Sequence, residues 1–279
     1  MLALSIVVSC KRTAAVTTAV SSSESKAECV PAAVSPAFAC NEKRVAIDTR
    51  PGVTLAFDLV EPSTTPKRAV ILLSGGDGKL SLSDEGMSES ASHNFAVRIR
   101  QAFANEGIVA AVPDVPSDQP NGLEGDFRSS KDHAEDMRAL IAWLDGKYHV
   151  PVWMVATSRG TISAANAAAR LGGSGPHGIV LTSPVTVSEN GKDSLAHVDL
   201  ATIQAPCQVV SHAEDGCPAS PHDGAKAMAD EHNWSFISEK GGSEHCSDAK
   251  CRCGPASHHG FEGLDGKVIP KILAFMNAG

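Results

Sequence analysis

The sequence predicts an α/β fold in which a mostly parallel sheet carries helices on both faces. Two observations lead to this prediction. Short apolar runs rich in β-branched residues alternate with longer segments in which apolar residues recur at helical spacing, a pattern typical of parallel sheets. One run, AVILLS at residues 69–74, is apolar throughout, as expected for a strand that is buried on both faces.

Turns and glycines define the first predicted elements. A Pro-Gly pair separates two strands, at residues 45–49 and 53–60, and a glycine-rich segment at 75–78 ends the strand at 69–74.

Two helices are indicated next by apolar residues three and four positions apart, at 95–106 and 132–144. Gly107 caps the first helix before a strand at 108–112, and a strand at 152–156 follows the second.

The second half of the chain continues the alternation. An alanine-rich helix at residues 160–171 ends at a Gly-Gly pair. The strands expected after it are 179–182, 208–211 and 234–238, and the expected helices are 221–231 and 264–275. The connection between residues 184 and 207 is too short for a large lid.

Composition excludes several classes of protein. With 24 Lys+Arg against 32 Asp+Glu, a net charge of −8 and only 3 Trp and 1 Tyr, the chain lacks the basic, aromatic surface of a nucleic-acid binder. No apolar run approaches the roughly 18 residues that a membrane span needs. Hydrophobic residues at 42% fit a globular domain, predicted at 41–279, whose oligomeric state the sequence does not indicate.

Residues 1–40 are predicted to be a leader and linker. A short apolar stretch ends at Cys10 without basic residues before it, which is typical of a clipped or weak export signal or of a lipoprotein-like one. Residues 13–36 have no periodicity, and a second small-residue cleavage site precedes Cys40. We therefore expect a bacterial protein with a signal peptide, secreted to the periplasm or the exterior or anchored by a lipid.

Cysteine usage also favours an oxidising compartment. Five of the eight cysteines lie in the last third of the chain, in expected loops, which favours disulfide bonds. Two alternatives are inert buried thiols and a zinc site made by Cys246, Cys251 and Cys253 with His245. The zinc alternative is weak because the spacing lacks the paired C-x2-C arms of structural zinc sites.

The clearest chemical motif is Ala156-Thr157-Ser158-Arg159-Gly160, where a buried strand turns into a helix. Small residues two positions before and after a serine permit a tight turn that exposes its hydroxyl, as in a nucleophile elbow. The helix start offers free amides to an oxyanion. The alternative is that Ser158 is an ordinary helix N-cap.

A serine nucleophile needs a base and an orienting acid, and both follow in the chain. Asp215 lies in the loop after the strand at 208–211, and His259 lies before the last helix. Glu214 competes with Asp215 for the acid role and His258 with His259 for the base role. Otherwise Asp215 would cap its loop and the histidine would be an exposed loop residue.

The order Ser, Asp, His differs from the orders in the two main serine protease groups. With segments 156–166 (ATSRGTISAAN), 214–217 (EDGC) and 259–263 (HGFEG), it resembles the α/β hydrolases, in particular small bacterial esterase-like members without a cap domain. The resemblance spans about residues 45–276. It implies the α/β hydrolase fold without a large lid, and a carboxylesterase-like serine hydrolase.

The resemblance also implies roles for single residues. Ser158 would be the nucleophile, His259 the general base and then acid, and Asp215 the carboxylate that holds the imidazole. The oxyanion hole would use the backbone amides of Arg159 and Gly76. Two positions depart from the family pattern, Ser74 in place of a histidine and Ala156 in place of a glycine.

If this triad forms, its acid and base loops meet, and a disulfide between Cys217 and Cys253 would hold them in register. Cys207 with Cys246 or Cys251 would be a second bridge. No metal site is predicted, because the histidines of the last third form no H-x3-H pair on a helix, and no cofactor is expected.

The predicted reaction is hydrolysis of small or short-acyl esters through an acyl-enzyme, and the expected partner is a small-molecule ester. The alternatives are an amidase or peptidase with the same triad, and a non-catalytic extracellular binding protein on this fold.

Overall fold

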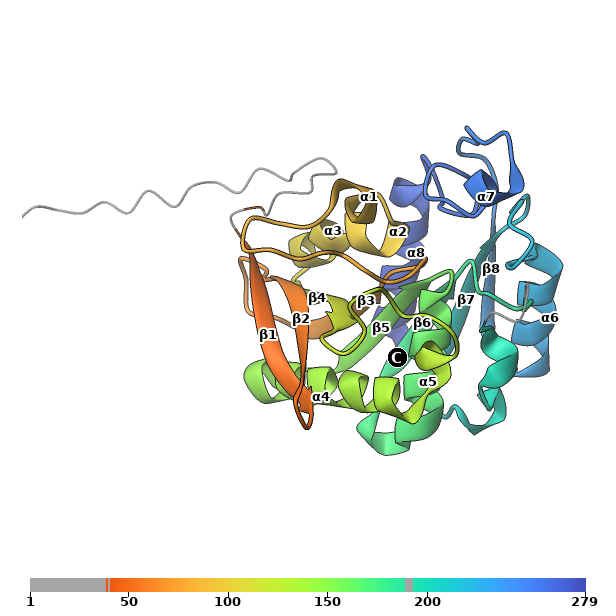
Figure 1. Cartoon of the computed structure of the whole chain (residues 1–279). Helices are drawn as coiled ribbons and strands as arrows, with labels where there is room; N and C mark the ends of the chain where they lie inside the picture. Colours follow the sequence, from red (N-terminus) through yellow and green to blue (C-terminus); the bar gives the residue numbers. More distant parts are fainter. Residues whose placement is uncertain (1–38, 40, 189–192) are drawn as a thin grey trace, which may run out of the picture.

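The computed structural model describes residue 39, residues 41–188 and residues 193–279 (Figure 1). The predicted leader and linker lie outside the described residues, apart from Ala39. Eight strands form one sheet in the order β1-β2-β4-β3-β5-β6-β7-β8. The strands are β1 (Glu42–Arg50), β2 (Val53–Val60), β3 (Arg68–Leu73), β4 (Ile108–Pro116), β5 (Val152–Thr157), β6 (Gly178–Thr182), β7 (Cys207–His212) and β8 (Ser235–Glu239).

The sheet is mostly parallel, as predicted. Strands β1 and β2 pair antiparallel, and so do β2 and β4, whereas all other neighbours pair parallel. Parallel strands end at the same edge, so the loops after β3, β5 and β7 gather at one side of the molecule. The candidate residues 74–78, 158–159 and 214–217 lie in these loops, and Gly160 begins the helix that follows β5.

Helices cover both faces of the sheet (Figure 1). The helices are α1 (Glu89–Ser92), α2 (Phe95–Arg98), α3 (Arg100–Asn105), α4 (Lys131–Tyr148), α5 (Gly160–Leu171), α6 (His222–Glu231), α7 (Ala249–Arg252) and α8 (Asp265–Ala278). Apolar residues of α4, α5 and α6 pack into the core on one face, and those of α2, α3 and α8 pack into the core on the other. None of the helices in the described part of the chain is long and apolar enough to cross a membrane.

No large lid covers the sheet in the part of the chain that the structure describes. Between β6 and β7 it contains only two short 3-10 helices, Leu195–His197 and Leu200–Thr202. Two others, Phe127–Ser129 and Gly172–Ser174, flank α4 and α5.

The prediction of one continuous helix at residues 95–106 is wrong. The segment is divided into α2 and α3 at Ile99, whose ψ of −2° departs from helical values. Ile99 itself is 1% exposed, so its packing keeps both short helices on the same core. The periodicity therefore identified the buried face correctly but could not show the break.

Gly178 at the start of β6 permits tight packing on Trp153. A Cβ atom there would lie 2.2 Å from the indole ring, which is fully buried. We expect Gly178→Ala to lower the free energy of unfolding by about 1–3 kcal/mol, because the ring has no room to move. The control is Gly146→Ala in α4, where no neighbouring atom lies within 4 Å of an added Cβ. This substitution should raise the free energy of unfolding by about 0.5–1 kcal/mol. Urea denaturation of both variants measures the difference.

Candidate active site

Ser158 lies in the sharp turn between β5 and α5. Its φ is +55°, a left-handed conformation that is uncommon for a residue other than glycine. The turn is held by hydrogen bonds: the Ser158 N–H donates to the carbonyl of Thr182 at 3.0 Å, and the Thr161 hydroxyl donates to the carbonyl of Ser158 at 2.6 Å. Such strain persists only where the surrounding structure enforces it, and it is concentrated at functional sites.

Two glycines let other backbone segments approach this turn. A Cβ on Gly160 would lie 2.4 Å from the carbonyl oxygen of Leu73, so only glycine lets α5 start so close to β3. A Cβ on Gly75 would lie 2.8 Å from the Cβ of Ser158. Ala156, which replaces a glycine of the family pattern, is fully buried inside β5 and meets no such restriction. The loop after β3 is thereby brought directly against the serine.

Asp215 and His259 form a buried pair. The Nδ1 of His259 lies 2.9 Å from Oδ2 and 3.3 Å from Oδ1 of Asp215, and the two side chains are 2% and 0% exposed. Asp215 also accepts the N–H of Cys217 at 2.9 Å, and the carbonyl of His259 accepts the hydroxyl of Ser183 at 2.8 Å. Both residues are therefore held by hydrogen bonds besides the one that joins them.

The second ring nitrogen of His259 is available for chemistry. Its Nε2 is buried and has no hydrogen-bond partner among the described residues. With Nδ1 donating to Asp215, the neutral form of the ring has its unprotonated nitrogen at Nε2. His259 and Ser158 line one cavity of about 260 Å³. The other residues around that cavity come mainly from the loops after β3 and before α8: Ser74, Gly75, Gly76, Asp77, Lys79, Leu80, Ser90, Ala91, Asn94, Phe95, Thr157, Cys253, Gly254, Pro255 and Gly260.

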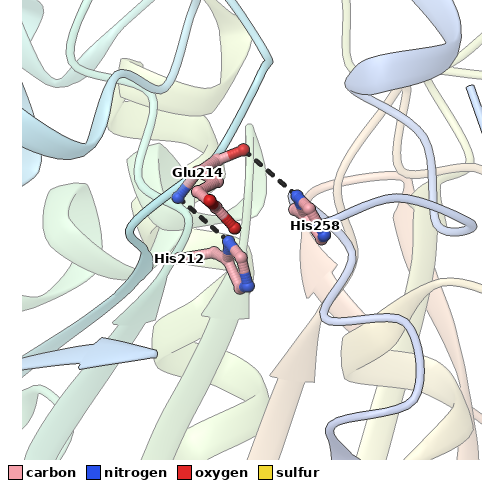
Figure 2. Close-up of side chains that lie close together, drawn as sticks. All are labelled: His212, Glu214 and His258. Atoms are coloured by element: carbon pink, nitrogen blue, oxygen red, sulfur yellow. Dashed lines mark hydrogen bonds between the residues drawn. The ribbon is translucent and has the colours of Figure 1, made fainter. Parts of the chain in front are cut away.

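The competing candidates, His258 and Glu214, lie close together beside His212 (Figure 2). The Nδ1 of His258 lies 3.3 Å from the backbone carbonyl of Glu214 and 3.3 Å from a carboxylate oxygen of Glu244. Its ring stacks on that of His212 with centroids 4.2 Å apart. Glu214 is exposed, and no hydrogen bond joins it to His259 among the described residues. These contacts link the two loops but do not reach Ser158.

His212, Glu214 and His258 offer ligand atoms within 4.8 Å of one another, the spacing of a metal centre. However, both ring nitrogens of His212 are already engaged: Nε2 donates to the carbonyl of Gly241 at 2.8 Å, and Nδ1 accepts the N–H of Glu214 at 3.1 Å. Burial lowers the pKa of His212, which favours the neutral ring. A metal would have to displace one of these hydrogen bonds, so the residues fit a metal poorly.

Two residues that line a cavity with Ser158 have backbone N–H groups without an acceptor among the described residues. Neither the N–H of Gly76 nor that of Arg159 donates a hydrogen bond within the described part of the chain. Gly76 has φ of +62°, a conformation that glycine adopts without strain. Gly76, Ser158 and Arg159 also line a second cavity of about 160 Å³, whose remaining walls are Val185, Val187, Asp193, Cys217, Ala219 and Cys253.

Disulfides tie the loops around the site together. Cys217, next to Asp215, is bonded to Cys253 in the segment that precedes His259, and Cys246 is bonded to Cys251. The second bridge predicted for Cys207 is wrong: Cys207 is a free thiol at the start of β7, 4% exposed, and burial raises its pKa. The zinc alternative is also excluded, because its three cysteines are used in these disulfides.

Arg128 was not identified from the sequence. Its guanidinium packs against the loop after β3 and donates to the carbonyls of Ser74 and Gly76. The residue lies in an expected loop, where arginines are usually exposed, so no signal in the sequence distinguished it.

Comparisons with known proteins agree on the fold. No protein-family model matches the sequence, and no curated protein matches it. Among solved structures, an esterase of Pyrococcus furiosus is similar with a TM-score of 0.59 and 12% identity over 85% of this chain and 92% of its own. A thermostable carboxyl esterase of Bacillus coagulans has a TM-score of 0.57 and 12% identity over 85% and 98%. An α/β serine hydrolase homologue of Coxiella burnetii has a TM-score of 0.55 and 15% identity over 85% of this chain and 96% of its own.

Proposed function

We propose, from the α/β hydrolase fold of this chain, that it is a serine hydrolase which cleaves carboxylic esters with small acyl groups. One observation carries the proposal: His259 is held by Asp215 with Nε2 unpartnered, and it lines the same cavity as Ser158 at a strained turn. A nucleophile, a base and an orienting acid in these relations are the requirements of acyl transfer.

The reaction would proceed through an acyl-enzyme. The Oγ of Ser158 attacks the ester carbonyl carbon while His259 Nε2 takes its proton, and Asp215 stabilises the resulting imidazolium. The carbonyl oxygen becomes an oxyanion that accepts hydrogen bonds from the amides of Gly76 and Arg159. His259 then gives the proton to the alkoxide oxygen, which leaves as the alcohol. Water, deprotonated by His259, attacks the acyl carbon. The bond from this carbon to the Oγ of Ser158 then breaks as His259 gives the proton to Oγ, which releases the acid and the free serine.

The two cavities that meet at Ser158 support different parts of an ester. The cavity of about 260 Å³ contains His259, which must protonate the leaving alcohol, so the alcohol would lie there among polar groups such as Lys79 and Asn94. The cavity of about 160 Å³ contains Gly76 and Arg159 and would hold the acyl chain. This volume lies well below the roughly 300–1,000 Å³ of sites for drug-sized ligands.

A series of p-nitrophenyl esters tests the acyl preference. We expect kcat/KM to be highest for the acetate to butyrate esters and at least about tenfold lower for the octanoate, because a long chain cannot enter the smaller cavity. Val185→Ala, which enlarges that cavity, should shift the preference toward longer chains. Equal rates on acetate and octanoate would contradict the assignment of the acyl side.

Labelling with a fluorophosphonate tests the proposed function directly, since this probe reacts only with an activated serine. The expected result is covalent modification at Ser158, found by peptide mapping, with loss of esterase activity in proportion. A folded protein that is not labelled would support a non-catalytic binding protein instead. Parallel assays on p-nitroanilides compare ester with amide hydrolysis.

The site of action that we propose is outside the cytoplasm. Two disulfides lie among the described residues, and such bonds persist in oxidising compartments. Expression in the periplasm should therefore give protein whose Cys217 and Cys253 resist alkylation without reductant.

A further inference from the structure

Arg128 is a buried arginine whose hydrogen-bond acceptors are all uncharged. The residue, in the 3-10 helix Phe127–Ser129, is 1% exposed. Its Nη1 donates to the hydroxyl of Ser163 at 2.9 Å, and its Nη2 donates to the carbonyls of Ser74 at 3.2 Å and Gly76 at 3.3 Å. Its Nε has no partner among the described residues.

Such an arrangement is costly, because a buried charge is normally paired with an opposite charge. The chain satisfies this rule elsewhere: Arg100, also buried, lies 2.9 Å from Glu42 and 3.2 Å from Asp58. Burial, followed by the nearby Arg159, lowers the pKa of Arg128 to about 9, although the carboxylates of Asp77 and Asp193, which do not bond to the guanidinium, act in the opposite direction. A group with this pKa is still a cation at neutral pH.

The contacts of Arg128 fix the loop after β3 on both sides of the Gly76 amide. The carbonyls of Ser74 and Gly76 belong to the peptide units before and after the unit that carries this N–H. The loop also wraps closely around the guanidinium, since a Cβ on Gly78 would lie 2.8 Å from Nη2. Arg159 donates to the same Gly76 carbonyl at 3.2 Å.

We propose that Arg128 is a positioning residue for the oxyanion hole. It holds the loop so that the Gly76 N–H points at the oxyanion, and its positive charge lies behind this amide, where negative charge develops in the transition state. The inference rests on the proposed function. Fixed dipoles and charges in a site with little water need no reorganisation during the reaction, which is why they stabilise an oxyanion strongly. Arg128 itself exchanges no proton and does not touch the substrate.

The test compares Arg128→Met with Arg170→Met. Arg170, near the end of α5, is exposed and donates to the carbonyl of Ser129 at 3.2 Å, so its change removes a guanidinium that contacts the segment of Arg128 without touching the loop after β3. The rate is expressed per serine labelled by the fluorophosphonate, which removes differences in folded fraction. On p-nitrophenyl acetate we expect Arg128→Met to lower kcat about 10- to 100-fold with KM within about twofold, and Arg170→Met to leave both unchanged.

A second readout separates positioning from a structural role. A phenylboronic acid forms a tetrahedral anion on an activated serine, so its inhibition constant should rise in Arg128→Met by about the factor by which kcat falls. Arg128→Lys keeps the charge but cannot hold two carbonyls and Ser163 with planar geometry, so its kcat should lie between those of wild type and Arg128→Met. If Arg128→Met does not fold, Arg128→Lys decides, with an expected several-fold loss of kcat.

The outcomes are distinct. Wild-type kcat per labelled serine and unchanged boronate inhibition in the folded Arg128 variant would overturn this inference and leave the proposed function intact. A loss confined to the melting temperature or to the labelled fraction would also overturn it. A wild-type protein that is not labelled at all would overturn the proposed function, and this inference with it.

Discussion

Replacing Ser158 with alanine is expected to lower kcat on p-nitrophenyl acetate by a factor on the order of 10⁴ or more. The variant keeps the amides of Gly76 and Arg159 and the pair of His259 and Asp215, but it has no atom that can form the acyl-enzyme. Residual hydrolysis would come only from binding and the oxyanion hole. Stopped assays over hours, with fluorophosphonate labelling as a second measurement, set the size of the loss.

The control for this variant is Ser174→Ala, at an exposed serine of the 3-10 helix Gly172–Ser174. This helix precedes the start of β6, whereas Ser158 follows the end of the parallel neighbour β5, so the two serines lie at opposite edges of the sheet. It should match wild type in activity and melting temperature. Ser158→Gly adds a separate test of the strained turn: glycine tolerates φ of +55°, so this inactive variant should be more stable than Ser158→Ala by about 1 kcal/mol. Undiminished turnover in Ser158→Ala would contradict the assignment of the nucleophile.

The turn around Ser158 could be predicted because its requirements are local. A buried strand, a serine between small residues and an alanine-rich helix follow one another directly in the sequence, and Gly160 is needed for the contact of α5 with β3. Asp215 and His259 are different. Nothing local identified them, and they were selected by chain order and by a family resemblance, which left Glu214 and His258 as alternatives.

The part of the site that could not be predicted depends on long-range packing. Arg128 reaches Ser74 and Gly76 from a distant segment, and a sequence pattern does not show which arginine of a polar loop is buried. The pairing of Cys246 with Cys251 rather than Cys207 has the same cause. Cys207 begins a buried strand, and its thiol is enclosed by the core instead of facing the loops.

The fold shows the same division between local and distant causes. Every strand was predicted in order. Continuous apolar runs indicated the central strands that are buried on both faces, such as β3 and β5, and the Pro-Gly turn indicated β1 and β2. The four-residue helices α1 and α7 were missed, since one turn is too short to show a helical period. Helix α7 lies in the segment held by both disulfides, so covalent bonds rather than an apolar face keep it in place.

His259→Ala is expected to lower kcat by a factor on the order of 10⁴ or more, whereas His258→Ala should keep kcat within about tenfold of wild type. The reason lies in the partners of the two rings. His259 donates to the buried carboxylate of Asp215, and its other ring nitrogen has no partner among the described residues. In the proposed mechanism this nitrogen takes the proton of Ser158, so the loss of the ring would leave the serine without a base. His258 instead binds the Glu214 carbonyl and stacks on His212, contacts that steady the loop.

Three measurements make this comparison decisive. Labelling by the fluorophosphonate should become very slow in His259→Ala but stay near wild type in His258→Ala. Added imidazole should restore some activity only to His259→Ala, because it can occupy the space of the missing ring. Asp215→Asn should lower kcat by a factor on the order of 10⁴, since an amide cannot stabilise the imidazolium. A greater loss of kcat in His258→Ala than in His259→Ala would show that His258 is the base. The hydrogen bond between Asp215 and His259 would then serve only to hold the two loops together.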